Sequence, residues 1–245
     1  MYHFFVKTIG SEDEIRISGA DFNHIKNAVR MKPGEAAVIS DENGGVFRCS
    51  LSRFEEREAV FVKEAPEKSS ELKTKVVLYQ GLPKSDKLEF IIQKAVELGA
   101  FKIVPVEMKR SVIRLDEKKK QAKTARWQAL SQAAAKQSGR AVIPQVAFPV
   151  DFDTALEMAK DTQLVLPYEE AEGVKSFFDF LSGIKTGDTV SVFIGPEGGF
   201  EREEVEKAKS CGAKIVSLGR RILRTETAAV SALCAIMLFQ EKNEE

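Results

Sequence analysis

The chain has 245 residues, of which 43 % are hydrophobic and 30 % charged, so it can bury a sizeable core as one large or two smaller domains. No apolar run approaches the ~20 residues that span a membrane, and the first residues lack the charged-then-apolar layout of a signal peptide. The three cysteines and two histidines are too scattered to predict a disulfide framework or a metal site. We therefore expect a cytoplasmic protein that uses neither a membrane nor a metal.

Charge is balanced over the whole chain but not along it. The 37 lysines and arginines equal the 37 aspartates and glutamates. Residues 73–140 nevertheless hold 16 basic side chains against 6 acidic ones, whereas the segments on both sides are net acidic. Such a local basic surface attracts phosphate even on a protein without net charge. We interpret it as an RNA-binding surface, with a solvated helix face as the alternative.

Residues 1–72 have the pattern of a small β domain. Alternating and β-branched residues predict strands at 14–17, 36–40, 46–51 and 58–62, with a hairpin turn at 41–45. One helix, over residues 19–30, interrupts these strands. The charged stretch 64–73, which contains Pro66, is the expected linker to the rest of the chain.

From residue 73 onward, predicted strands and helices alternate, and no internal repeat is present. Apolar β-branched runs predict strands at 75–80, 101–106, 143–147, 163–166, 189–194 and 214–219. Helical spacing predicts helices at 85–98, 116–138, 151–160, 173–182, 201–211 and 226–240. Six such units predict an α/β domain, residues 73–245, with a mostly parallel sheet and helices on both of its faces.

Two short runs near the C-terminus, residues 193–200 and 218–229, each follow a predicted strand and lead into a helix. Both should therefore lie at the C-terminal edge of the sheet, where open α/β folds bind ligands. The glycines of the first run, Gly-Pro-Glu-Gly-Gly, allow a close approach of the backbone to a ligand. That run alone is a weak signal, because it is neither G-x-G-x-x-G nor a P-loop and also fits a plain turn.

The second run is more informative, because it places three arginines and Glu226 around Ile222 and Leu223. Arginines stacked at a buried helix start are costly unless they meet an anion or a carboxylate. The helix that follows is apolar on every side over 228–239. It must be buried, either against the sheet or against a second subunit.

Further motifs accompany these two runs. Residues 83–87 read Pro-Lys-Ser-Asp-Lys, Arg126 precedes Trp127, and residues 137–140 read Gln-Ser-Gly-Arg. Taken together, the motifs resemble those of the RsmE family of the SPOUT superfamily, whose members methylate a uridine of 16S ribosomal RNA. Two positions depart from the family pattern: Lys136 stands where an acidic residue is usual, and residues 28–30 keep only the arginine of Val-Leu-Arg.

The resemblance implies a small PUA-like β-barrel domain over residues 1–72, followed by a SPOUT methyltransferase domain over 73–245 with a C-terminal trefoil knot. It implies S-adenosyl-L-methionine as the methyl donor. The implied acceptor is N3 of a uridine in 16S rRNA, in the decoding region of the small ribosomal subunit. It also implies a homodimer, which the apolar helix at 226–240 supports.

The resemblance places the cofactor in the two C-terminal runs and at the end of the strand at 163–166. Backbone groups there can cradle the adenine and methionine parts without a charged residue. The expected cofactor-binding residues are Leu166, Pro167, Ile194, Gly195, Pro196, Glu197, Gly198, Leu218, Gly219, Ile222, Leu223 and Ala228.

Methylation at N3 sets a chemical requirement, since uracil N3 is a poor nucleophile while it keeps its proton. A catalyst needs a base, or cations that stabilise the anion left on the ring. We expect Glu226 as the base, with Glu197 as second choice, and Arg224 and Arg110 as the stabilising cations. The alternative for Glu226 is a first-turn glutamate that the helix dipole favours.

The basic residues of both domains are the candidates for RNA contacts. They are Arg30, Lys32, Lys84, Lys87, Arg114, Lys118, Lys119, Lys123 and Arg126. Trp127 has the chemistry to stack on a base, but its helical spacing with Leu130 and Ala134 favours a place in the core.

Two other functions are compatible with this pattern. A related SPOUT enzyme would methylate the ribose 2′-hydroxyl, but such enzymes typically carry Ser-Leu-Asn where this chain has Arg-Thr-Glu-Thr at 224–227. A scaffold that binds RNA without catalysis would give no heat with S-adenosylmethionine in calorimetry.

Overall fold

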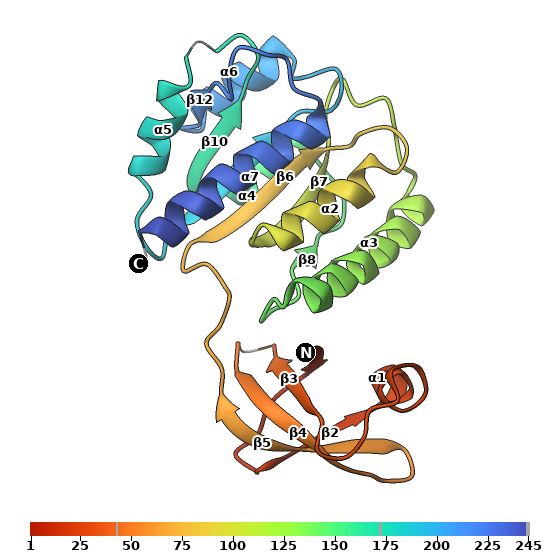
Figure 1. Ribbon diagram of the computed structural model, residues 1–245. Coiled ribbons are helices and arrows are strands. Elements are labelled where there is room, and N and C mark those ends of the chain that lie inside the picture. Colours follow the sequence, from red (N-terminus) through yellow and green to blue (C-terminus); the bar gives the residue numbers. More distant parts are fainter. Residues whose placement is uncertain (43, 172, 244–245) are drawn as a thin grey trace. The chain divides into compact units, whose positions relative to one another are not determined.

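The computed structural model in Figure 1 describes residues 1–42, 44–171 and 173–243. These residues form two compact units. Unit 1 combines Met1–Glu71 with Ala135–Ile143, and unit 2 combines Leu72–Ala134 with Pro144–Glu245.

Unit 1 contains a curled β-sheet, with strand order β1-β3-β4-β5-β2 among the residues described. Its strands are β1 (Tyr2–Val6), β2 (Glu14–Ser18), β3 (Ala36–Asp41), β4 (Val46–Phe54) and β5 (Glu58–Pro66). β1 pairs with β3 in parallel, and the other pairs are antiparallel. Two irregularities in the β4–β5 pairing bend the sheet around a core that includes Phe4, Ile39 and Phe61.

The sequence analysis did not predict β1. It also ended β5 too early, since this strand continues to Pro66, inside the segment expected as the linker. The helix predicted over 19–30 is present, but it is not one regular α-helix. It is an α-helical turn, α1 (Gly19–Asn23), followed by a π-helical turn, η1 (His24–Val29), which ends at a left-handed Arg30 with φ 56°. The wider turn allows Phe22, Ile25 and Met31 all to be buried in the same core.

Unit 2 is built on a sheet with order β12-β10-β11-β6-β7-β8, and β9 also pairs with β7. Every one of these pairs is parallel. The strands are β6 (Lys75–Gly81), β7 (Ala100–Glu107), β8 (Gln145–Val146), β9 (Val150–Asp151), β10 (Gln163–Pro167), β11 (Thr189–Ile194) and β12 (Lys214–Val216). The prediction of a small N-terminal β domain, followed in the sequence by an α/β fold with a parallel sheet, is confirmed.

Helices pack on both faces of this sheet, as Figure 1 shows. They are α2 (Lys87–Glu97), α3 (Glu117–Ser138), α4 (Phe152–Ala159), α5 (Lys175–Ser182), α6 (Arg202–Ser210) and α7 (Thr225–Lys242). α2 and α7 pack against each other, and α7 lies along β6 and β11. On the other face, α4 and α6 cover an apolar core.

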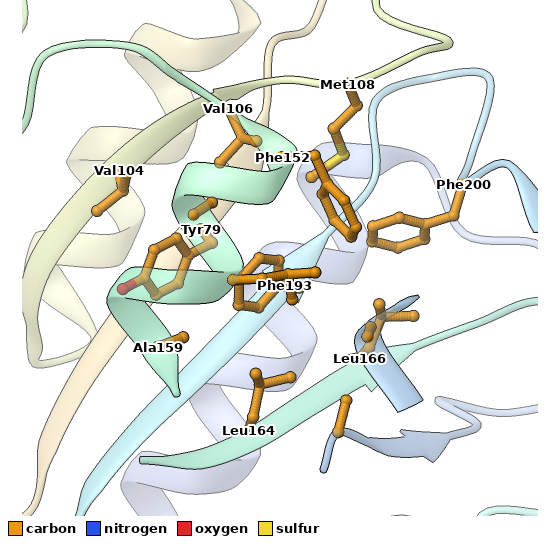
Figure 2. Close-up of a cluster of buried hydrophobic side chains, with 14 of the residues drawn as sticks. Tyr79, Val104, Val106, Met108, Phe152, Ala159, Leu164, Leu166, Phe193 and Phe200 are labelled. Atoms are coloured by element: carbon orange, nitrogen blue, oxygen red, sulfur yellow. The ribbon is translucent and has the colours of Figure 1, made fainter. Parts of the chain in front are cut away.

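That core contains the aromatic side chains of Tyr79, Phe152, Phe193 and Phe200 among aliphatic ones (Figure 2). The Tyr79 and Phe193 rings are stacked, with centroids 4.4 Å apart and an interplanar angle of 6°. Phe152 of α4 meets Phe193 edge-on at 5.9 Å, and Phe200 extends the cluster toward the C-terminal edge of the sheet. This packing fixes β11, whose C-terminal end leads into one of the loops of the candidate site.

The last helix is buried on one side only within the single chain. Ala229, Leu233 and Ile236 are buried, whereas 57 % of Leu238 is exposed. None of the helices described has the length and apolar character needed to cross a membrane. No group of three or more histidines, cysteines or carboxylates able to hold a metal ion occurs in the part of the chain described.

Candidate active site

A cavity of about 360 Å³ lies at the C-terminal ends of β10, β11 and β12. Three loops from strands that are neighbours in the sheet form its walls, and the start of α7 closes it. Its lining residues are Lys87, Pro167, Tyr168, Glu169, Ile194, Gly195, Pro196, Glu197, Gly199, Phe200, Ser217, Leu218, Gly219, Arg220, Arg221, Ile222, Leu223, Arg224, Thr225 and Ala228. Both C-terminal sequence runs therefore meet at one edge of the sheet, as the parallel topology requires.

The glycine-rich loop after β11 is packed too closely for side chains. A Cβ atom on Gly195 would lie 3.1 Å from the backbone carbon of Gly199, which itself has φ +70°. A Cβ atom on Gly81, at the end of β6, would lie 2.6 Å from Pro196. Glycine at these positions allows the loop to fold back on itself and to expose its backbone toward the cavity.

Arg110 and Glu204 hold the outer side of this loop. Arg110, in the loop after β7, donates from Nη1 to the Gly198 carbonyl at 2.8 Å and pairs through Nε with Glu201 at 2.9 Å. The hydrogen bond from Arg110 lowers the pKa of Glu201. Buried Glu204 accepts from the backbone N–H groups of Lys109 and Glu201, both at 2.9 Å.

Glu197, Lys87 and Glu226 form a charged row at the start of α2 and α7. Glu197 accepts from the Lys84 backbone N–H at 3.0 Å and pairs with Lys87 Nζ at 3.0 Å. Lys87 Nζ also lies 3.6 Å from Glu226 Oε2. That buried oxygen has no hydrogen-bond partner among the residues described.

In the pair of Glu197 and Lys87, the pKa of the carboxylate is lowered and the pKa of the ammonium is raised. Burial raises the pKa of Glu197, but hydrogen bonds from its own backbone N–H, from Lys87 and from the Lys84 N–H together bring it below its ordinary value. The hydrogen bond with Glu197 raises the pKa of Lys87. Both groups are therefore charged at neutral pH, and Glu197 acts as an anchor for the Lys84 loop.

Two buried Thr–Gln pairs connect α7 to β6 and to Thr74, the residue directly before β6. At the cavity, Gln80 Nε2 donates to Thr225 Oγ1 at 2.8 Å, and Thr225 Oγ1 donates to the Gly195 carbonyl at 2.6 Å. At the other end of the helix, Thr74 Oγ1 donates to Gln240 Oε1 at 2.9 Å. These partners lie 145 and 166 residues apart in sequence, and they fix the register of α7 on the sheet.

We expect Thr225→Val to lower the free energy of unfolding by about 1–3 kcal/mol, because it removes the hydroxyl between two buried polar groups. Thr225→Ser keeps that hydroxyl and should lose clearly less. Urea denaturation of both variants measures the difference. Equal stability of the valine variant and the unmodified protein would contradict the role of this pair.

Most of the predicted cofactor residues do line the cavity. The exceptions are Leu166, whose side chain lies in the aromatic core, and Gly198, which faces Arg110. Among the predicted catalytic residues, only Arg224 lines the cavity. Glu226 pairs instead with the lining residue Lys87, and Arg110 binds the Gly198 carbonyl.

Sequence reasoning missed Tyr168, Glu169, Gly199, Phe200, Ser217, Arg220, Arg221 and Thr225 as lining residues, and it assigned Lys87 to RNA alone. All of these residues except Lys87 lie within the segments 193–200 and 218–229, directly beside them, or directly after Pro167 as the pair Tyr168 and Glu169. Including every residue of these segments, their immediate neighbours and the pair after Pro167 would have found them.

The predicted RNA-binding residues divide between the two units. Arg30 and Lys32 belong to unit 1, and the remaining ones belong to unit 2. On α3 and beside it, several cations already have partners: Lys119 pairs with Asp116 at 3.1 Å, and Arg126 pairs with Glu89 at 2.8 Å. Trp127 is 3 % exposed, which confirms that it belongs to the core.

Comparison with known proteins places both units in one family. Residues 70–237 match the RNA methyltransferase domain, and residues 17–64 match the RNA methyltransferase PUA domain. Ribosomal RNA small subunit methyltransferase E of Bacillus subtilis (strain 168) is 36 % identical over 245 residues, 96 % of each chain. The protein of the same name from Mesomycoplasma hyopneumoniae is 32 % identical over 234 residues, 95 % of this chain and 97 % of that one.

A solved structure agrees with this assignment. The ribosomal RNA small subunit methyltransferase E of Neisseria gonorrhoeae, crystallised with S-adenosyl methionine, superposes with a TM-score of 0.82 at 28 % identity and covers 97 % of both chains. The chain therefore belongs to the RNA methyltransferase family that contains the ribosomal RNA small subunit methyltransferases E.

Proposed function

We propose that this protein transfers a methyl group from S-adenosylmethionine to N3 of a uridine in 16S ribosomal RNA of the small subunit, in the cytoplasm. The observation that carries the proposal is the cavity of about 360 Å³ at which both C-terminal runs meet. The names of the relatives support the choice of ribosomal RNA as the acceptor.

The residues of the cavity fit such a methyl donor. The volume lies within the roughly 300–1,000 Å³ typical of small-molecule sites. Gly195 and Gly199 leave a bare backbone surface, and Leu218, Ile222 and Leu223 add peptide groups and apolar side chains on the facing wall. When bound, S-adenosylmethionine supplies an electrophilic methyl group on sulfur, and the transfer needs an in-line approach of N3 to about 3–3.5 Å.

Glu226 is our candidate for the base that takes the N3 proton. Its Oε2 is buried and has no hydrogen-bond partner among the residues described, and Lys87 Nζ lies 3.6 Å away as an ion-pair partner. In the proposed reaction this oxygen accepts the N3 proton. Glu197 is the weaker candidate, because the Lys84 N–H and Lys87 already occupy it and lower its pKa. In this proposal, Lys87 bridges the two carboxylates and neutralises part of their charge.

Arg224 is our candidate for stabilising the uracil anion. It lines the cavity directly before α7, so its guanidinium can meet the ring oxygens on which the negative charge develops. Arg110 contributes to the reaction indirectly, since it fixes the Gly198 carbonyl and Glu201 and thereby the loop that contains Gly195.

We also propose a trefoil knot and a homodimer. The segment after β12 leads into α7, which crosses to β6 and is fastened there through Gln80 and Thr74. This long-range path supports the knotted SPOUT topology. Exposed Leu238 and half-buried Met237 and Phe239 support an isologous contact along α7. Sedimentation that shows a monomer at micromolar concentration would exclude the dimer.

Calorimetry and methyl transfer together test the proposed function. We expect S-adenosylmethionine to bind with measurable heat, and its labelled methyl group to reach the 16S RNA of small subunits that lack the modification. Free 16S RNA and assembled subunits are compared in parallel, which identifies the true substrate. A folded protein that gives no heat would instead be a non-catalytic RNA-binding scaffold.

A further inference from the structure

Residues 219–224 form an exposed basic loop on one side of the cavity, which we call the rim loop. It starts at Gly219, whose φ of +128° suits glycine alone, and it ends where α7 begins. Arg220, Arg221 and Arg224 are exposed, and Ile222 between them is 88 % exposed. Among the exposed large hydrophobic side chains of the residues described, Ile222 has the largest exposed fraction, and it lies between cations.

The arginines of the rim loop differ from the other cations near the site in their partners. Lys87 pairs with Glu197, Arg110 with Glu201, and Lys109 with Glu203. In the part of the chain that the structure describes, no ion pair involves Arg220, Arg221 or Arg224. Carboxylates of the part of the chain described therefore do not neutralise these three charges, which lie at the mouth of the site.

The chemistry of the rim loop matches a single-stranded RNA segment. Guanidinium groups bind phosphate oxygens in a bidentate way, and an exposed apolar side chain packs against the face or edge of an unstacked base. A base must leave its stack before its N3 can reach the cavity, because base pairing hides that atom. Phosphates on either side of such a nucleotide would then lie near the mouth.

We propose that Arg220 and Arg221 of the rim loop bind phosphates next to the methylated nucleotide, while the Ile222 side chain supports the unstacked base. This inference rests on the proposed function, because it concerns the acceptor side of the same cavity. It makes the rim loop the part that favours an unpaired nucleotide, whereas the basic surface of α3 contributes more general attraction for RNA.

The test compares charge removal at two places in unit 2. Arg220→Ala combined with Arg221→Ala should weaken binding of a single-stranded, uridine-containing RNA oligonucleotide by about 10–100-fold. The slope of log affinity against log salt should fall by roughly 0.7 per lost phosphate contact. Lys207→Ala combined with Lys209→Ala removes the same charge from α6, where both lysines are paired with acidic residues, and should change neither quantity.

Ile222→Ser separates the apolar contact from the charges. It should weaken oligonucleotide binding by several-fold and leave the salt slope unchanged, because no phosphate contact is lost. All variants are checked for folding by circular dichroism and for S-adenosylmethionine binding by calorimetry. With duplex RNA of the same sequence, the arginine and Ile222 variants should lose much less affinity than with the single strand.

Three results would overturn the proposal. One is an unchanged salt slope in the double arginine variant, which would leave these residues as solvated cations. Another is an equal loss of affinity for duplex and single strand. The third is conversion of the double variant to a monomer in sedimentation, which would place the rim loop in a contact between subunits. Because oligonucleotide binding does not depend on methyl transfer, a failure of the proposed reaction would be seen separately.

Discussion

Gly195→Val is expected to abolish binding of S-adenosylmethionine in a protein that still folds. The first added carbon would already lie 3.1 Å from the Gly199 backbone and 3.3 Å from the Phe200 ring, so the loop after β11 must shift. Displacement of a binding loop by about 1 Å costs on the order of 100-fold in function. We therefore expect the affinity measured by calorimetry to fall by about 100-fold or more.

A matched control is available in the same unit. A Cβ atom on Gly183, at the end of α5, would meet nothing closer than 3.4 Å, and its φ of −84° suits any residue. Gly183→Val should therefore bind S-adenosylmethionine as the unmodified protein does. Unchanged affinity in folded Gly195→Val would move the cofactor site away from this cavity.

The second large effect concerns Glu226. If this carboxylate removes the N3 proton, Glu226→Gln should lower kcat by roughly 10²–10⁴-fold, the usual contribution of a general base. Raising the pH should restore part of the loss, because hydroxide can then form the uracil anion. Single-turnover rates on small subunits, measured across pH, follow both effects.

Arg224→Lys distinguishes the base from the stabilising cation. Lysine keeps the charge but lacks the planar fork of the guanidinium, so the rate should fall without recovery at high pH. Both variants should still bind S-adenosylmethionine. A Glu226→Gln enzyme with the rate of the unmodified protein would show that cations alone activate N3, and Glu226 would then only favour the start of α7.

Local sequence patterns predict much of this fold. Several buried parallel strands are short runs rich in β-branched residues, such as Thr189–Ile194, and the apolar residues of α2, α4 and α5 recur at helical spacing. Since parallel strands end at a common edge, the positions of the runs at 193–200 and 218–229 in the sequence suffice to place them together. β1 was not predicted because its sequence, which includes His3 and Phe5, shows no alternation of apolar and polar residues. Its parallel partner β3 also lies more than thirty residues away in the sequence.

The interactions that shape the site were not predictable in the same way. Gln80 meets Thr225, and Arg110 meets Gly198, across 145 and 88 residues of sequence. Nothing in the spacing of either residue indicates its partner, because the contact depends on strand order and on the path of the chain after β12. For the same reason, the excess charge of residues 73–140 overstated the free basic surface, since Lys119 and Arg126 have carboxylate partners.

The identity of the modified nucleoside tests the central claim most directly. Small subunits without the modification are incubated with the protein and labelled S-adenosylmethionine, and their 16S RNA is digested to nucleosides and separated by chromatography with mass detection. The account predicts that the label appears in 3-methyluridine, at one position of the RNA. Label in a 2′-O-methylated nucleoside, or no transfer to 16S RNA by a protein that binds the donor, would contradict it.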